Sequence, residues 1–429
     1  MKRVLLSATA LALVGQFFQT SEAVASGFLV REHSAEGLAT AYGGDGSRAD
    51  EAATVFNNPA GMMHLSGDEV EVGSAVIFPS IHFSGSATIA GVAPLPGDNG
   101  GNGGRIQSIP HLYGAWTIND RLKVGIAVTV PFGLVTDYGT TWIGRYLAMK
   151  TLALSADINP NIAYRVNNWL SIAGGVSAQY LKLESSVAIP QFLILSAPAA
   201  PDATFYFKGD DWAWGYNFGL LAEVDPSTRI GLTYRSEVDH KPAGTEAFQA
   251  ANPVLGLANS KATAHGANLP ASIGASVTHD YASNWSVSTD VQFTQWSSLQ
   301  TVLITSSNIP VSFEEKFKDT WMIAVGATYR ADDHLTWRGG IAWDQTPVTD
   351  RYRTVAIPDA DRVMVGLGLG YRWDDSNNID FGVSHYFSTE HASMNNSLNN
   401  KDPLTQAIKL QGTFNNHLDY VAISFRHKL

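Results

Sequence analysis

Apolar residues occupy every second position in several stretches of the chain. Between Arg362 and Trp373, every second residue from Val363 onward is apolar or aromatic, whereas the residues between them are arginine, methionine or glycine. Glycines cannot fill a protein core, so we expect the small and charged face to be the interior and the continuous apolar face to point outward. This alternation is typical of strands in an outer-membrane barrel, which place one face against lipid and the other in the lumen.

The same alternation recurs along the chain, and polar turns separate the stretches that carry it. It appears in Leu122–Val130, Arg229–Arg235, Met322–Arg330 and Tyr420–Leu429, and a first strand is expected near Glu69–Ser84. Short Asn-, Asp- and Ser-containing turns are typical hairpin connections. Six such turns alternate with seven longer connections, near 86–105, 134–145, 187–205, 238–266, 298–317, 347–361 and 389–412. The sequence therefore predicts an all-β fold, a 14-stranded antiparallel transmembrane β-barrel over residues 67–429 with both termini on the short-turn side.

The first 25 residues have the composition of a secretory signal peptide. Lys2 and Arg3 precede an uncharged apolar stretch, and Ala23-Val24-Ala25 supplies a small-residue cleavage site. Residues 1–25 are therefore predicted to be removed on export. An N-terminal membrane anchor is the less favoured alternative.

Residues 26–66 follow neither the strand pattern nor the turn pattern. Ser34–Thr54 is rich in alanine, glycine and serine and has few of the β-branched residues that strands favour. A segment of this size on the periplasmic side fits inside a barrel. We expect residues 26–66 to be a lumenal hatch, or plug.

Composition and motifs narrow the possible functions. The chain has no cysteine, a formal net charge of −11 and only 16% charged residues, which argues against a thiol nucleophile, cysteine-ligated metals and nucleic acid as the main partner. Its histidines show no metal-binding spacing, and nucleotide-binding and serine-hydrolase motifs are absent from the sequence. Ser384 and His385 are adjacent and would point to opposite faces of a strand. We therefore expect no cofactor, no metal and no enzyme activity.

Several short segments, spread over essentially the whole mature chain, together form a distinctive set. They are Ser26-Gly27-Phe28, Ser34–Leu38, Ala41–Gly44, Asn58–Met62, Pro131–Leu134, Gly144–Tyr146, Asn159-Pro160, Tyr164–Val166, Asp344–Val348, Ile357–Asp359 and Asp361-Arg362. In colinear order they resemble segments of a known family, the FadL-type outer-membrane transporters of long-chain fatty acids and other hydrophobic compounds. The resemblance implies a plugged fourteen-stranded barrel, ligand capture at extracellular loops, and exit through a wall opening beside a kinked third strand.

Two segments are candidates for the exit route. Asn58-Pro59-Ala60, with Phe28, belongs to the hatch that the resemblance implies, and Asn-Pro by itself is also a common turn. In the third strand, Pro131 cannot donate a ladder hydrogen bond. Phe132 and Gly133 continue an extended apolar pattern beyond it, which favours an inward bulge over a simple strand end.

Two connections carry unusually apolar residues for surface loops. Phe192, Leu193 and Leu195 lie in one, and Phe248 and Leu255 lie in the other. Exposed apolar patches of this kind mark binding or membrane contact. We expect them to form a groove that captures an amphipathic ligand, with mutual packing as a barrel lid as the alternative.

A fatty-acid carboxylate needs a cationic partner, and three residues are candidates. Lys318 shares strand parity with the inward residue Met322, at a position that resembles the family's head-group site. Arg362 is a second candidate next to Asp361, and Lys182 in the fifth strand is a weaker one. For each of them, a lumenal ion pair is the alternative.

The sequence as a whole predicts a bacterial outer-membrane channel for the passive uptake of hydrophobic molecules. Long-chain fatty acids are the expected ligands and monoaromatic hydrocarbons the alternative. A general porin, a structural barrel and a lipid hydrolase are the rival classes. Expected partners are the ligand, outer-membrane lipid and lipopolysaccharide, and we expect a monomer that binds no nucleic acid.

Overall fold

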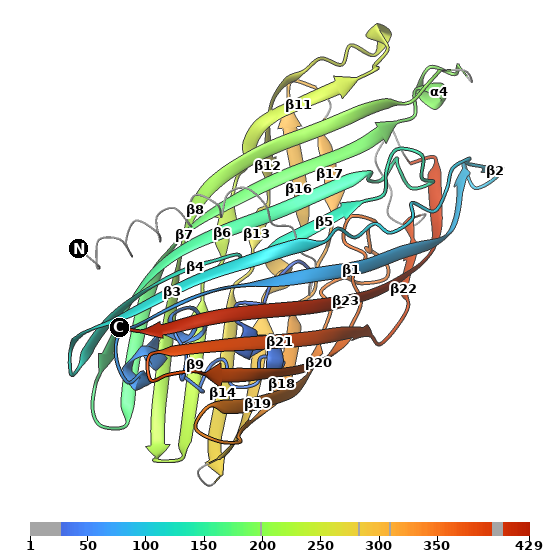
Figure 1. Cartoon of the computed structure of the whole chain (residues 1–429). Coiled ribbons are helices and arrows are strands. Elements are labelled where there is room, and N and C mark those ends of the chain that lie inside the picture. The colour runs from blue at the N-terminus through green and yellow to red at the C-terminus, as the bar shows by residue number, and fades with distance from the viewer. Residues whose placement is uncertain (1–26, 198–199, 282–283, 309, 397–405) are drawn as a thin grey trace.

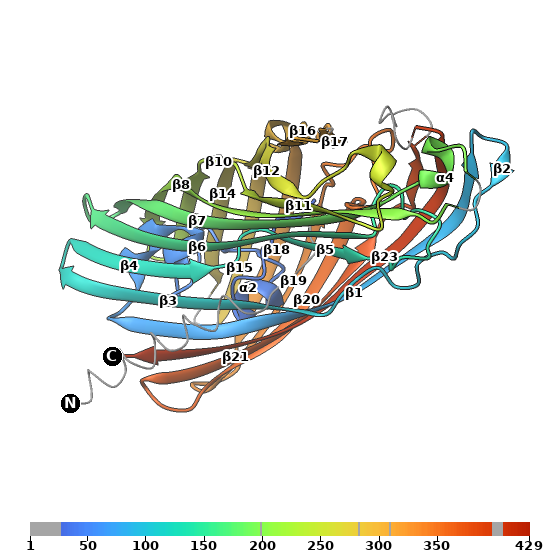
Figure 2. The same ribbon diagram turned by 90° about the horizontal axis from the view of Figure 1, so that it is seen from above.

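The computed structural model is a closed antiparallel β-barrel of fourteen wall strands (Figures 1 and 2). It describes residues 27–197, 200–281, 284–308, 310–396 and 406–429, so the expected signal peptide lies outside the described residues. The barrel closes because β1 (Glu69–Ile89) pairs with the C-terminal β23 (Ile408–Lys428) along its whole length. The predicted fold class and strand number are therefore confirmed.

Several wall strands consist of two consecutive segments. Between β1 and β23, the wall contains β3 (Gln107–Asn119), β4 and β5 (Leu122–Thr129, Gly133–Asp137), β6 (Lys150–Arg165), β7 (Leu170–Ile189), β8 (Ala203–Asp225), β9 and β11 (Thr228–Arg235, Ala243–Gln249), β12 and β14 (Ser260–His265, Ser272–Tyr281), β15 and β16 (Trp285–Thr294, Thr301–Ser306), β17 and β18 (Val311–Glu314, Thr320–Arg330), β19 (Leu335–Asp344), β20 (Arg362–Arg372), and β21 and β22 (Asn377–Ser388, Ala392–Asn395). Short β2 (Ala93–Pro94), β10 (Val238–His240) and β13 (Ala267–Leu269) complete the strands.

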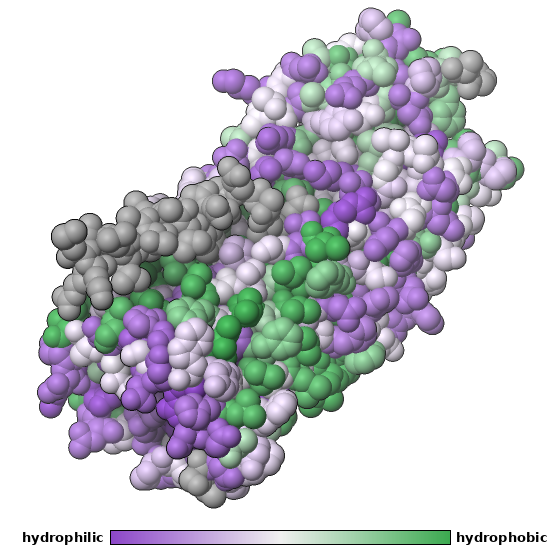
Figure 3. Space-filling model, in the orientation of Figure 1, coloured by the Kyte–Doolittle hydropathy of each residue, from purple (hydrophilic) through white to green (hydrophobic). Residues whose placement is uncertain are grey.

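Side-chain exposure follows the alternation expected from the sequence. In β20, Leu367 is 61% exposed and Tyr371 is 46% exposed on the outer face, whereas Arg362 and Met364 are buried on the inner face. Figure 3 shows apolar side chains gathered over β1, β23 and β21, with polar side chains toward both ends of the molecule. This apolar outer surface is the one that a lipid bilayer covers.

The strands reach farther than the sequence pattern indicated. Parts of the expected connections 238–266, 298–317 and 389–412 are strands β11, β12, β16, β17 and β22, so these boundaries were wrong. β8 has 23 residues, about twice the length that crosses a bilayer. Where a strand extends beyond the lipid-facing part of the barrel, neither of its faces meets lipid. The alternation of apolar and polar residues is then lost, even though the strand still hydrogen-bonds to its neighbours.

The helical elements are short. They are α2 (Ala35–Ala39), α3 (Thr54–Asn57), η1 (Pro59–His64), α4 (Gln191–Ile194), η2 (Pro253–Leu255) and η3 (Trp296–Ser298). Among the described residues, no helix has the length and apolar character needed to cross a membrane. Figure 2 shows α2 among the wall strands.

Residues 27–66, here called the N-terminal segment, pack against the inner wall at glycine positions. A Cβ atom added to Gly340 of β19 would lie 2.0 Å from the carbonyl oxygen of Thr40, and one added to Gly366 of β20 would lie 2.4 Å from that of Leu38. Backbone therefore meets backbone at van der Waals distance. The inward-facing glycines of the alternating pattern make this close approach possible.

Buried ion pairs join the N-terminal segment to the wall. Glu36 binds Arg48 of the same segment at 2.8 Å and Arg338 of β19 at 3.2 Å. Arg338 also binds Asp380 of β21 at 2.7 Å. Because the guanidinium groups lie between carboxylates from different elements, these pairs fix the position of α2 on the wall.

Candidate functional site

The third wall strand is interrupted between β4 and β5. Thr129 pairs with Asp157 of β6, and Gly133 pairs with Leu154, so four steps along the third strand match three along β6. One residue is therefore in excess, which is the definition of a β-bulge. The predicted kink residues Pro131, Phe132 and Gly133 lie at this interruption.

The N-terminal segment pairs with the interrupted strand. Val30 donates its backbone N–H to the Pro131 carbonyl, and Gly133 donates to the Phe28 carbonyl, both at 2.9 Å. On the other side, the Phe132 N–H donates to Ser155 Oγ at 2.8 Å. The backbone groups that the bulge would leave unpaired are thus satisfied by the N-terminal segment and one serine.

Four buried aromatic side chains meet beside the interruption. Phe28 lies 5.0 Å from Trp296 and 5.9 Å from Phe132 between ring centroids, and Phe317 lies 5.6 Å from Trp296. Their edge-to-face packing is a favoured geometry for aromatic pairs. This aromatic cluster joins the N-terminal segment, the third strand and the connections that precede β16 and β18.

A cavity with mainly apolar walls, here called the outer cavity, lies on the extracellular side of the aromatic cluster. Phe28 forms part of its wall, together with residues of β5, β6, β7, β8, β16 and β17. Its apolar lining includes Leu134, Leu152, Leu181, Phe207, Ile304 and Ile357, and its acidic lining residues are Glu184 and Glu315. The outer cavity has the apolar character that an acyl chain or a hydrocarbon requires.

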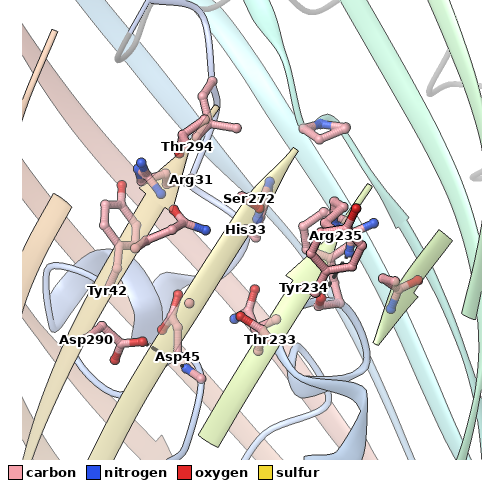
Figure 4. Close-up of a pocket in the computed structure, with 18 of the residues that line it drawn as sticks. Arg31, His33, Tyr42, Asp45, Thr233, Tyr234, Arg235, Ser272, Asp290 and Thr294 are labelled. Carbon is pink, nitrogen blue, oxygen red and sulfur yellow. Dashed lines mark hydrogen bonds between the residues drawn. The ribbon is translucent and has the colours of Figure 1, made fainter. Parts of the chain in front are cut away.

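A second, more polar cavity, here called the inner cavity, lies against the N-terminal segment (Figure 4). Pro59, Pro131 and Phe132 are all part of its wall. Arg235 pairs with Asp157 at 3.5 Å and lies 3.9 Å above the Phe56 ring. The inner cavity therefore brings the exit-route residue Pro59 together with the kink residues Pro131 and Phe132, which lie far from it in the sequence.

Titratable groups of the N-terminal segment at the inner cavity have shifted pKa values, among them His33 and Asp45. Burial, together with the positive charge of Arg235, lowers the pKa of His33 to about 3. Burial raises the pKa of Asp45 to about 7, while the Arg48 guanidinium opposes that shift. His33 is therefore neutral at physiological pH, as expected for a buried imidazole without a carboxylate partner.

Asn58-Pro59-Ala60 packs against the wall. Asn58 donates through Nδ2 to the carbonyls of Gly46 at 2.7 Å and Leu220 at 3.0 Å, and its Oδ1 accepts from the Ala60 N–H. Gly219 of β8 faces the Asn58 amide so closely that an added Cβ would lie 2.2 Å from Oδ1. Asn58 thereby caps η1 and attaches it to the wall.

The three cationic candidates occupy different environments. Lys318 is exposed, so the inward orientation expected for it was wrong. The chain leaves strand geometry between β17 and β18, where Lys316 has a φ of 47°. The inward and outward alternation of β18 therefore does not extend back to Lys318. Arg362 is buried, with its guanidinium 3.7 Å from both Asp344 and Asp359. Lys182 binds Glu184 at 2.8 Å.

The apolar loop residues are partly buried and pack in two groups. Phe192 and Leu193 pack against the large cluster that includes the aromatic residues, whereas Phe248 packs 5.6 Å from Phe205 in another cluster. Gln191 joins the two loops, donating to the Ala250 carbonyl and accepting from the Asn252 N–H. Leu195 and Leu255 are partly exposed, and neither the outer nor the inner cavity includes any of the five residues.

Other residues at the site were not found by sequence reasoning. Asp359 accepts hydrogen bonds from the Gly27 N–H at 2.7 Å and from the Thr346 hydroxyl at 2.6 Å, which holds the start of the N-terminal segment. Thr346 and Asp359 lie within segments that resemble the FadL family, so that resemblance was their available signal. Trp296 and Glu315 lie in connections without a distinctive pattern.

Fold and site together define the class: an outer-membrane β-barrel with an apolar cavity beside an interrupted wall strand. Residues 16–428 match the family model described as outer membrane protein transport protein (OMPP1/FadL/TodX). The chain is 31% identical to the long-chain fatty acid transport protein of Escherichia coli K12, over 90% of this chain and 92% of that protein. The chain therefore belongs to the OMPP1/FadL/TodX family.

Two solved structures illustrate the fold. A Pseudomonas aeruginosa FadL homologue superimposes with a TM-score of 0.86 at 24% identity, covering 94% of this chain and 99% of that one. The Pseudomonas putida toluene transporter TodX superimposes with a TM-score of 0.69 at 16% identity, covering 92% and 98%. As a member of the OMPP1/FadL/TodX family, the protein is a transporter of hydrophobic compounds in the bacterial outer membrane and not an enzyme.

Proposed function

We propose that this transporter carries long-chain fatty acids into the outer membrane and releases them sideways through its wall. In this proposal, the loop groove captures the ligand, the outer cavity holds its chain, and the exit passes the interruption at Pro131–Gly133. The observation that carries the proposal is the position of the aromatic cluster, because Phe28 contributes to the outer cavity and also packs on Phe132 at the interruption.

The N-terminal segment would act as the hatch. Its backbone hydrogen bonds to Pro131 and Gly133 close the interrupted strand, so a shift of Phe28 and Val30 would remove both bonds and part of the cavity wall together. Burial of a sixteen-carbon chain contributes on the order of 10 kcal/mol at about 0.8 kcal/mol per methylene. Release from a rigid cavity would therefore be slow, and a conformational change that weakens the cavity is needed.

The substrate class rests on relatives rather than on one residue. The Escherichia coli protein is named a long-chain fatty acid transport protein, and the more distant TodX structure is named a toluene transporter. Higher identity to the former supports the fatty-acid assignment, and monoaromatic hydrocarbons are the alternative. We further propose that the protein acts as a monomer in contact with membrane lipid and lipopolysaccharide.

Competition binding tests the substrate. A fluorescent long-chain fatty acid is titrated into the detergent-purified barrel and displaced with unlabelled oleate or toluene. Displacement by oleate at much lower concentration than toluene is expected. Displacement by toluene alone would transfer the assignment to hydrocarbons, and binding of neither would contradict uptake of hydrophobic ligands through these cavities.

A further inference from the structure

Glu315 is a carboxyl group in the wall of the outer cavity. It follows β17, is 5% exposed, and is surrounded by apolar lining residues such as Leu299, Phe313 and Ile357. One of its oxygens, Oε2, is buried and has no hydrogen-bond partner within the part of the chain that the structure describes. The Thr354 hydroxyl hydrogen-bonds to the same carboxyl group. An unpartnered buried oxygen at a cavity wall is costly unless it is protonated or a ligand meets it.

No cation neutralises this carboxyl among the described residues. Across the cavity, Glu184 is paired with Lys150 at 3.1 Å and Lys182 at 2.8 Å. On the connection that carries Thr354, the guanidinium of Arg353 is bound by Asp350 and by the Asp359 carbonyl. The neighbouring Glu314 and Lys316 are only partly buried and are absent from the cavity wall, and Lys318 is exposed.

The isolated environment changes the protonation of Glu315. Burial raises the pKa of its carboxyl to about 7, and the hydrogen bond from Thr354 only partly opposes that shift. Glu315 lies in the connection between β17 and β18 and belongs to neither strand. At mildly acidic pH the carboxyl is therefore neutral and carries a proton that it can donate.

We propose that Glu315 selects amphiphiles with an uncharged polar end, such as a fatty alcohol, a fatty ester or a protonated fatty acid, by donating a hydrogen bond to that end. This inference rests on the proposed function and deepens it by assigning the head-group chemistry of the outer cavity. A carboxylate anion is disfavoured there, because it would face a carboxyl oxygen instead of a free cation. Fatty acids would then occupy the cavity as the neutral acid.

The test uses ligands that do not titrate, so that any pH effect belongs to the protein. The dissociation constants of methyl oleate and of hexadecane are measured at pH 6 and pH 8.5 in the purified full-length barrel, by displacement of a fluorescent long-chain fatty-acid methyl ester. An ester only accepts hydrogen bonds, so if it needs the protonated form of Glu315, its affinity falls roughly tenfold to thirtyfold between the two pH values. Hexadecane, which accepts no hydrogen bond, should show no such change.

Substitutions separate hydrogen bonding from structure. Glu315→Gln keeps a donor at every pH and should remove the pH dependence while retaining ester binding. Glu315→Leu should weaken the ester at pH 6 and leave hexadecane unaffected. Glu314→Gln makes the same chemical change one residue away, outside the cavity wall, and should behave like the unmodified protein.

The outcomes distinguish the two proposals. Ester binding that is independent of pH and unchanged in Glu315→Leu would overturn the role of Glu315 while the transporter assignment stands. Oleate binding that strengthens at pH 8.5 would also overturn it. Failure of ester, oleate and hexadecane to bind at either pH would instead contradict the proposed function.

Discussion

Individual side chains at the site are distinguished mainly by the partners that they already have. Arg362 and Lys182 are adjacent to carboxylates, whereas Lys318 is exposed and lies outside both cavities. A buried guanidinium between two carboxylates holds elements together, because removing it leaves uncompensated charge. Arg362 is therefore expected to act in stability and Lys318 in neither stability nor binding.

Two substitutions test whether Arg362 stabilises the fold and whether Lys318 contributes to ligand binding. Arg362→Met leaves Asp344 and Asp359 with less cationic compensation and should destabilise the fold by about 3 kcal/mol, whereas Lys318→Ala should change oleate affinity less than twofold. The midpoint of heat-induced unfolding in detergent and the displacement assay measure the two effects. Arg330→Met, which changes an exposed arginine at the C-terminal end of β18, is the control. A tenfold loss of oleate binding in Lys318→Ala would restore it as a head-group residue.

Among the elements, the interrupted third strand is the one that links wall and N-terminal segment. Leu29 is the antiparallel partner of Phe132, and the hydrogen bonds on either side make this a non-hydrogen-bonded pair. Such pairs have short Cα–Cα distances of about 4.5 Å, which lie within the range of a disulfide. The natural chain contains no cysteine, so an introduced pair has no competing thiol.

A disulfide between these positions should hold the proposed hatch, the N-terminal segment, against the third strand. In Leu29→Cys/Phe132→Cys, oxidation should slow the release of bound fluorescent fatty acid into acceptor vesicles at least tenfold, and reduction should restore the rate. The reduced double variant and each single variant are the controls, since they share the side-chain losses. Equal release rates in oxidised and reduced protein would exclude an exit that requires this contact to open.

For the whole molecule, we propose that the N-terminal segment closes the lumen, because its backbone packs directly on the backbone of the wall. Gly340 faces Thr40 of the N-terminal segment, whereas the adjacent Gly339 faces outward, and an added Cβ there would lie at ordinary contact distances, 3.4 Å from the Leu367 side chain and 3.8 Å from the Gly366 carbonyl oxygen. The same substitution at the two positions therefore separates the effect on closure from the effect on strand stability.

Gly340→Val should displace the N-terminal segment and make the barrel permeable to ions, whereas Gly339→Val should leave it closed. Single-channel recordings in planar bilayers measure the difference, and the heat-induced mobility shift in detergent shows whether each barrel has folded. A large, steady conductance in the unmodified protein would favour the general porin. No conductance from folded Gly340→Val would show that closure does not depend on this contact.

The fold was predictable because its determinant is local and repeats. Residues such as Val365 and Leu367 alternate with glycines, and a strand period of two converts that pattern directly into an outer and an inner face. Turn residues then give the strand number. In β11 and β12, neither face of the strand meets lipid, so the alternation of apolar and small residues disappears. These strands were therefore missed in the sequence.

The site was only partly predictable, because its contacts join distant segments. Pro131, Phe132 and Phe28 were identified by their local chemistry and by family resemblance, and the structure brings them together. Lys318 was misplaced because strand parity was extended across a connection with different backbone geometry. Trp296 and Glu315 carry no local pattern that marks them as part of a cavity wall.

The sequence by itself determined the class of barrel, its strand number and its export to the outer membrane, since lipid on one side and lumen on the other impose a period on every strand. Only the tertiary structure decided which side chains meet in the lumen, which cations are already paired, and that an unpaired carboxyl lines the outer cavity. These properties depend on the register of strands far apart in the chain and on how the N-terminal segment packs, and no short-range pattern encodes either.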